Sequence, residues 1–383
     1  MASLFVRNVL KCSYLRLVRG ICGETLASNQ DLIPRVDLAL PKDDIVKKIV
    51  QAAKSGGPGF FYLTNHGIDQ SVFINAINES HKFYRQPLEK KLKISFLGYA
   101  GSPHDKSSKG YTHPGFEGNY AKDSASDIRP EKEKATTQKN LREALVFRYP
   151  ELSEADRLYL QDYKKFLKNF NNTIDSVDDE NVIGPAARRF FADNQWPNQK
   201  DLPNFRPTVE LYFDEISKLA HKMFRLFQNA LRSELDVSED QHFFHHDTPM
   251  STLNLAHYPP SDKEGLGISD HTDWELFTLL YPSFHPVQDT VSYTGLEVWF
   301  QDEWVRVPHL PGTIIVNQGE MLSRFSNGRF RPPVHRVDAK HDRDRYSLVS
   351  FWAPNFETLL PESNVPSKNV LSGEYYLKRN NMI

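Results

Sequence analysis

The feature that most constrains the fold is a change in hydrophobic spacing at about Thr248. Beyond this residue, short apolar or alternating runs are separated by turn residues such as Pro282, Gly295 and Asn327-Gly328. Closely spaced runs of this kind predict strands of a sandwich or barrel. The expected strands cover residues 276–281, 296–300, 304–307, 313–316 and 346–352.

Before this point the chain has mainly helical spacing. A long helix is expected over about 207–235, because apolar residues there recur every three or four positions. Its expected core residues are Val209, Leu211, Ile216, Leu219, Met223, Phe224, Phe227 and Leu231. Nearer the N-terminus, a strand at 33–38, a helix ending at Gly56-Gly57, a buried strand at 60–63 and a second helix through Phe83 are expected. Helices followed by a strand array predict an α+β fold.

A poorly patterned segment separates the two halves, from about residue 97 to 194. Gly, Ser, Lys and Asp dominate its first part. A long segment of this kind is typical of a functional covering loop or of a surface insertion.

The charge balance excludes two classes of partner. Lys and Arg number 47 against 49 Asp and Glu, so the net charge is −2 over 383 residues. Near-neutrality gives no general reason to bind nucleic acid or an anionic membrane. No apolar run approaches the roughly 20 residues of a membrane-spanning helix. We therefore expect a small-molecule partner; the oligomeric state is left open.

The N-terminal residues differ from the rest of the chain. Four basic residues precede the first acid, Glu24, among apolar side chains; they are Arg7, Lys11, Arg16 and Arg19. This is the profile of a mitochondrial presequence, although apolar and basic positions do not separate around a helix. We expect a loosely ordered leader over 1–30 in a cytoplasmic protein, with a cleaved mitochondrial presequence as the alternative.

The cysteine content directs attention to histidine. Cys12 and Cys22 both lie in the leader, so a disulfide framework and a cysteine zinc site are excluded. Any metal must then be held by His and carboxylate ligands.

Two histidines and one aspartate form a metal-site candidate. In the tripeptide His271-Thr272-Asp273 a strand period of two would place the first and third side chains on one face. His335 follows downstream, flanked by apolar positions. Two histidines and one carboxylate with open positions make the facial triad typical of non-haem Fe(II) oxygenases.

Arg345 and Ser347 strengthen this interpretation. They lie ten and twelve residues beyond His335 and, two apart on an expected strand, share one face. A planar guanidinium with a hydroxyl is suited to binding a carboxylate.

The other histidines are expected to be structural. His242, His245, His246 and Asp247 are assigned to a polar turn, and His66 to a strand end. His257 and several others have no suitably spaced partner. The G-x-S-x-G, Walker A and dinucleotide motifs are lacking, which excludes those classes of site.

On these residues the chain resembles the isopenicillin N synthase-like branch of the 2-oxoglutarate/Fe(II)-dependent dioxygenases. The most specific segments are SDHTDWELFTLLYP, GLEVWFQDEWVRVPHLPGTIIVNQGEMLSRFSNGRFRPPVHRV and RYSLVSFWAP. The N-terminal half contributes Ile33–Leu38, Gly59–Gly67, Gly110-Tyr111, Gly115-Phe116-Glu117, Arg142-Glu143-Ala144 and Asn194-Gln195-Trp196-Pro197.

The resemblance implies a double-stranded β-helix, or jelly roll, backed by helices. It implies that Fe(II) is bound by the triad, and that Arg345 and Ser347 bind the far carboxylate of 2-oxoglutarate while Tyr258 touches the oxoacid end. Phe351 falls where the family often lines the substrate pocket. Ala256 stands where many plant relatives have Asn, and Asn254 is displaced from that position. The segment 118–194 is enlarged relative to the family.

The implied activity is oxidation of a small organic molecule coupled to decarboxylation of 2-oxoglutarate by O2. Hydroxylation, desaturation and cyclisation are all open outcomes. Two alternatives remain: an oxidase in which Arg345 and Ser347 hold the substrate's own carboxylate, and a non-catalytic jelly-roll binding protein. A role in secondary metabolism fits the family.

The expected segments follow from this comparison. They are a leader (1–30), an N-terminal dioxygenase region (31–120), a variable covering segment (121–200), a long supporting helix (201–247), the Fe(II)/2-oxoglutarate core (248–357) and a C-terminal tail (358–383).

Overall fold

The computed structural model describes residues 32–95, 109–114, 141–148, 193–262, 265–288, 290–361 and 370–379. The expected leader over 1–30 and most of the covering segment lie outside these residues.

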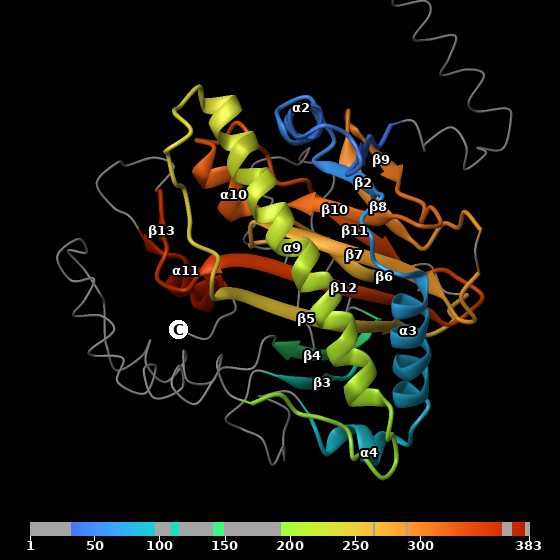
Figure 1. Ribbon diagram of the computed structural model, residues 1–383. Coiled ribbons are helices and arrows are strands. Elements are labelled where there is room, and N and C mark those ends of the chain that lie inside the picture. The colour runs from blue at the N-terminus through green and yellow to red at the C-terminus, as the bar shows by residue number, and fades with distance from the viewer. Residues whose placement is uncertain are drawn as a thin grey trace, which may run out of the picture.

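The described strands form a large sheet, a second sheet facing it and a short hairpin (Figure 1). In sheet order the large sheet contains β1 (Arg35–Asp37), β2 (Phe60–Thr64), β10 (Ile314–Gln318), β7 (Phe277–Phe284), β12 (Arg345–Asn355), β5 (Pro249–Tyr258), β4 (Glu143–Arg148) and β3 (Gly110–Thr112). The second sheet contains β6 (Leu266–His271), β11 (His335–Asp338), β8 (Leu296–Phe300) and β9 (Glu303–Arg306). The hairpin is β13 (Leu359–Leu360) with β14 (Val370–Leu371).

The helices complete the described fold. They are α2 (Lys42–Ala53), α3 (Gln70–Tyr84), α4 (Leu88–Leu92), α9 (Phe205–Leu235), α10 (Glu320–Phe325) and α11 (Ser372–Arg379). Figure 1 shows α9 running diagonally across the outer face of the large sheet, with α2 beside its upper end and α3 beside its lower end. The predicted α+β architecture is confirmed.

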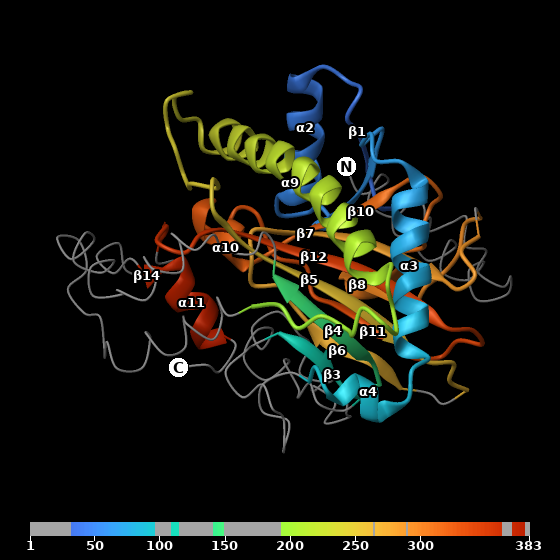
Figure 2. The same ribbon diagram turned by 60° about the horizontal axis from the view of Figure 1, so that its bottom comes forward.

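Two apolar clusters lie on the two faces of the large sheet. The outer cluster joins the helices to it; for example, Phe227 of α9 stacks on Phe277 of β7 with ring centroids 5.1 Å apart. The inner cluster lies between the sheets and includes Tyr62 and Ile315 from the large sheet and Val298 from the second sheet. This sandwich is the jelly-roll core, and Figure 2 shows the second sheet behind the large one.

Two expectations about individual residues are wrong. Leu211 was expected in the core of α9, but it is 50% exposed, because the helix buries only the stripe that faces the sheet. Pro282 was expected to end its strand, yet β7 continues to Phe284. β10 pairs with β7 only as far as Leu280, so the edge of β7 beyond Leu280 has no β10 partner. Proline, which has no N–H to donate, is tolerated at such an edge.

The strand β5 was not predicted individually, although it lies near the centre of the large sheet between β12 and β4. All ten of its residues are buried. Its apolar-polar alternation is also broken at Ser251-Thr252 and Leu255-Ala256, so the pattern of a half-exposed strand is incomplete. β4, from the segment expected to cover the active site, pairs with β5 and is part of the same sheet.

Candidate metal and co-substrate site

The structure brings the three predicted metal ligands together at one end of the second sheet. His271 ends β6, His335 begins β11, and the two are register partners. Asp273 Oδ1 lies 3.7 Å from Nε2 of each histidine. One ligand atom from each residue falls within 4.8 Å of the others, and no second such group of His, Cys, Asp or Glu occurs in the described part of the chain.

The reason for this proximity differs from the one expected. Asp273 is not on a strand but in the loop that follows β6. Its main-chain oxygen accepts a hydrogen bond from the nitrogen of Glu320, 2.9 Å away at the start of α10. Gly319 permits this close approach, since a Cβ there would lie 2.2 Å from the Glu275 carbonyl oxygen. The loop is thus shaped by α10, not by strand alternation.

The Asp273 carboxylate is oriented by two donors on neighbouring strands. Thr278 Oγ1 of β7 donates a short hydrogen bond to Oδ2, and Asn317 Nδ2 of β10 donates to the same oxygen over 2.7 Å. Oδ2 is therefore occupied, and Oδ1 faces the histidines. Neither residue was predicted from the sequence, because both stand in otherwise apolar strands, 5 and 44 positions from Asp273.

Main-chain carbonyls fix the tautomer of both histidines. His271 Nδ1 lies 2.8 Å from the Ser269 oxygen, and His335 Nδ1 lies 3.1 Å from the Pro333 oxygen. A carbonyl only accepts hydrogen bonds, so each Nδ1 carries the proton and each Nε2 presents a lone pair toward Asp273. This is the arrangement in which neighbouring groups orient metal-binding imidazoles.

The electrostatics fit metal ligation. Burial, with repulsion from His335, lowers the pKa of His271 to about 3, so its imidazole is neutral at pH 7. Burial by itself would raise the pKa of Asp273, but the two histidines, Thr278 and Asn317 lower it overall. The site thus combines imidazole nitrogen with an ionised carboxylate oxygen, a donor set suited to Fe(II).

The predicted co-substrate residues form a second cluster on the inner face of the large sheet. Arg345 is 1% exposed, and its Nη2 donates to Ser347 Oγ over 3.3 Å. Tyr258 is the register partner of Arg345 on β5, and the guanidinium carbon lies 3.9 Å from the centroid of its ring. The three side chains therefore lie together.

The guanidinium of Arg345 has hydrogen-bond donors that no described residue accepts. Its Nε and Nη1 are buried without a hydrogen-bond partner among the described residues. Burial lowers the pKa of Arg345, although it stays a cation at neutral pH. Leaving a buried charged donor unsatisfied is costly, and a carboxylate of a bound ligand would satisfy two donors at once. The cluster fits the dicarboxylate 2-oxoglutarate.

Phe351 is six residues further along β12 and paired with Thr278 of β7, the residue that holds Asp273. It is partly buried and packs against the inner cluster. Along β12, Arg345, Ser347 and Phe351 share the face that looks into the sandwich.

A buried polar network that no sequence pattern predicted lies on the outer face. His257, expected to have no partner, lies between Glu143 Oε1 (2.8 Å from Nδ1) and Asp344 Oδ1 (2.7 Å from Nε2). Lys91 Nζ is 2.8 Å from Glu143 Oε2, and Tyr111 donates to the same oxygen over 2.5 Å. The partners come from separate strands and helices, so no local spacing could indicate them.

Two family models match the chain. That of the 2OG-Fe(II) oxygenase superfamily matches residues 249–354, and that described as the N-terminal part of non-haem dioxygenase in morphine synthesis matches 33–199. A 2-oxoglutarate-dependent dioxygenase of Monascus ruber is 28% identical over 85% of each chain. One of Didymella fabae is 29% identical over 82% of this chain and 80% of its own.

The fold comparison agrees. The crystal structure of a full-length Neurospora crassa protein in complex with alpha-KG superposes with a TM-score of 0.63 at 21% identity, covering 91% of this chain and 95% of that one. Its resemblance shows the shared jelly-roll fold. The two family matches reach from residue 33 to residue 354, and together with these relatives they establish that the chain belongs to the 2-oxoglutarate/Fe(II) oxygenase superfamily, as an oxidoreductase of the dioxygenase type.

Proposed function

We propose that His271, Asp273 and His335 bind Fe(II), and that Arg345, Ser347 and Tyr258 hold 2-oxoglutarate beside it. The enzyme couples decarboxylation of 2-oxoglutarate to oxidation of a small organic molecule. The observation that carries this assignment is the pairing of a compact His-Asp-His cluster with a buried arginine whose Nε and Nη1 have no described partner.

Each residue has a separate task. Bound Fe(II) and 2-oxoglutarate supply the oxidising chemistry, with O2 consumed and succinate and carbon dioxide as co-products. Arg345 neutralises the far carboxylate, and the Ser347 hydroxyl, which accepts from Arg345, keeps its own proton to donate. The apolar inner cluster keeps water from the reacting groups.

The substrate enters beside Phe351. The same Neurospora crassa protein has been crystallised with alpha-KG and thymine, which fits a small ring-sized molecule as the class of substrate for this fold. We propose a small organic acid, amino-acid derivative or secondary metabolite, contacted by Phe351 and by the covering segment. We place the enzyme in the cytoplasm, with the mitochondrion as the alternative. No helix in the described part of the chain is long and apolar enough to cross a membrane.

The decisive experiment is anaerobic titration of the purified protein with Fe(II) and then 2-oxoglutarate. We expect a saturable visible charge-transfer band. Asp273→Ala should remove both the bound iron and the band. Arg345→Gln should keep the iron but need about ten- to a hundredfold more 2-oxoglutarate, since one charge-assisted contact contributes about 1.5–3 kcal/mol.

Arg343→Gln is the matched control, because this arginine is two positions away but only half buried and bonded to Gln288. The Arg343→Gln variant should require the same concentration of 2-oxoglutarate to saturate the band as the unmodified chain. Iron binding without a band would point instead to an oxidase that takes electrons from its own substrate. Failure to bind iron would refute the metal assignment and favour a binding protein.

A further inference from the structure

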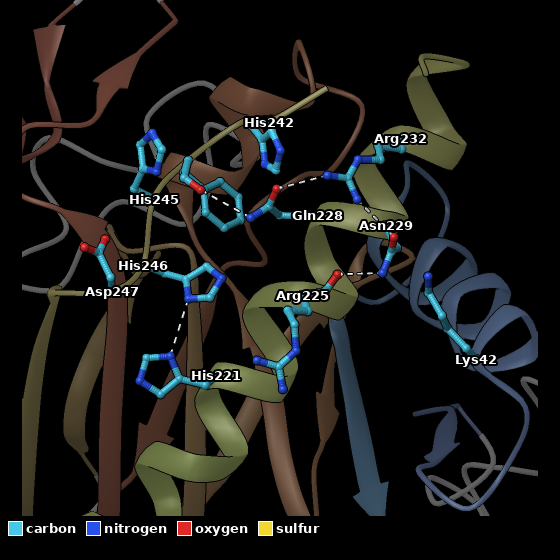
Figure 3. Close-up of a pocket in the computed structure, with 11 residues that line it drawn as sticks. Lys42, His221, Arg225, Gln228, Asn229, Arg232, His242, His245, His246 and Asp247 are labelled. Carbon is cyan, nitrogen blue, oxygen red and sulfur yellow. Dashed lines mark hydrogen bonds between the residues drawn. The ribbon is translucent and has the colours of Figure 1, made fainter. Parts of the chain in front are cut away.

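A cavity lies on the helix-covered side of the large sheet, away from the predicted metal site. It has a volume of about 660 Å³ and lies between the C-terminal half of α9, the segment 242–247 and the first residue of α2, Lys42 (Figure 3). Phe224 and Phe227 of α9 pack against the outer face of the large sheet, whereas Asp273 is held from its inner face by Thr278 and Asn317. The large sheet therefore separates the two sites.

The lining of this cavity is strongly basic. Lys42, Arg225 and Arg232 contribute three positive charges. None of the three forms an ion pair with a carboxylate among the described residues. Four histidines add polar lining: His221, His242, His245 and His246. The single acid, Asp247, accepts a hydrogen bond from Asn355 Nδ2 over 2.6 Å.

The cavity wall is ordered by neutral contacts. Arg232 donates to the Gln241 carbonyl oxygen over 2.9 Å and to Asn229 Oδ1 over 3.1 Å, so its guanidinium is held in place without being neutralised. Figure 3 shows Arg232 extending from α9 toward Gln228 and His242, whereas Arg225 extends toward the His221 end of the wall. Arg232 is the cation held in advance, and such a charge binds a ligand at a lower entropic cost than a mobile one.

A histidine pair forms the far end of the wall. His246 stacks on Phe224, with centroids 4.8 Å apart and planes inclined by 3°. Its Nδ1 lies 3.4 Å from His221 Nδ1. Burial, with repulsion from Arg225, lowers the pKa of both imidazoles. They are therefore neutral at pH 7 and can donate a hydrogen bond to an anion without adding charge.

Helix electrostatics explain only part of this arrangement. Arg232 lies in the last turn of α9, where the helix dipole favours a cation. Arg225 is about two turns earlier. Lys42 belongs to another helix, where it is the first residue and is opposed by the dipole. The presence of all three in the lining of one cavity needs a different reason.

We propose that this cavity binds a compact, multiply charged phosphate group, such as the diphosphate of a nucleotide or free pyrophosphate. Three unneutralised cations match two to three negative charges, and guanidinium groups bind phosphate oxygens in a fork. The volume falls within the range of small-molecule sites. The site is independent of the iron and 2-oxoglutarate residues.

The test is isothermal titration of the metal-free full chain with pyrophosphate and, separately, ADP, at low ionic strength. We expect one saturable site per chain. Arg225→Gln and Lys42→Gln should each weaken binding about tenfold or more, and the double variant further, since each removes a charge-assisted contact. Both side chains are exposed, so neither change should alter the fold.

Lys222→Gln is the matched control, because Lys222 is an exposed cation on the same helix that does not line the cavity. It should leave the affinity unchanged, as should Asp273→Ala. If ADP binds more tightly than pyrophosphate, the ligand is a nucleotide. If the two bind equally, the site recognises the phosphate group alone. Absence of saturation, or equal weakening by Lys222→Gln, would overturn the proposal in favour of diffuse surface charge.

Discussion

At the residue scale, the carboxylate of Asp273 shows how neighbouring groups define a ligand. One oxygen is fully engaged by Thr278 and Asn317, so the other is presented to the two histidine nitrogens. Side chains that orient a metal ligand typically change metal affinity by about ten- to a hundredfold when removed. Thr278 and Asn317 are therefore positioning residues.

Thr278→Val tests this role at nearly constant volume. We expect Fe(II) affinity to fall by about ten- to a hundredfold, because Asp273 loses a donor and can rotate. Thr278→Ser, which restores the hydroxyl, should recover most of the affinity. Metal binding measured by competition with a chelator reports both values. Equal affinity in the Val and Ser variants would contradict the role of the hydroxyl.

Glu143 gives a pH prediction. Burial opposes its ionisation, but His257, Lys91 and Tyr111 lower its pKa below the ordinary value of 4.5 overall. A group whose pKa is lower in the folded state stabilises the fold above its unfolded pKa, and this stabilisation is lost as the pH falls below about 4.5. Glu143→Gln should therefore flatten the fall in the free energy of unfolding as the pH drops below about 4.5.

Chemical denaturation of the metal-free protein at several pH values measures this slope. Glu239→Gln serves as the control, because Glu239 is exposed and has no described ion pair. It should leave the slope as it is. If the free energy of unfolding of Glu143→Gln changed with pH as it does in the unmodified protein, the network would not depend on the ionised carboxylate.

At the scale of elements, α9 anchors the helical layer to the large sheet. Its buried stripe includes Phe227, which is fully buried against Phe277 and Phe61, whereas Leu211 on the same helix is half exposed. Helical spacing alone could not separate the two, because both are apolar and both fall on a broad stripe. The sheet decided which face is covered.

Phe227→Ala should lower the free energy of unfolding by about 3–5 kcal/mol, since it removes buried surface and leaves a cavity. Leu211→Ala should change it by no more than about 0.5 kcal/mol. Urea unfolding followed by circular dichroism compares the two. Similar losses in both variants would mean that α9 packs through a different face.

At the scale of the whole molecule, the triad joins a strand end, a loop and a second strand that are up to 64 positions apart in sequence. Ligands that bind only the folded state stabilise it by mass action, by about 2.7 kcal/mol at a concentration a hundred times Kd. Mn(II) can replace Fe(II) in this test because it is not oxidised under these conditions. Mn(II) added together with 2-oxoglutarate should therefore raise the Tm of the protein by a few degrees.

Asp273→Ala should abolish this rise in Tm, and Asp342→Ala, at an exposed position, should preserve it. Differential scanning fluorimetry with and without the ligands measures the effect. A rise of equal size in Asp273→Ala would place the stabilising metal elsewhere in the molecule.

The sequence by itself determined those features that depend on residues within one short stretch of the chain. Three of these features are local patterns: the helical spacing of about 207–235, the strand runs after residue 276, and the two-residue spacing of Arg345 and Ser347. A local pattern can be read from the sequence without knowing the fold. The candidate ligands His271, Asp273 and His335 were recognisable because metal chemistry restricts residue type.

The tertiary structure alone decided which groups meet from distant strands. Sheet order and helix placement decide that β5 is a central strand and that Thr278 and Asn317 donate hydrogen bonds to Asp273. They also decide that His257 lies between Glu143 and Asp344, and that three cations line the outer cavity. Such contacts carry no local signature, because the alternation of β5 is interrupted and a polar partner many residues away leaves no spacing to detect.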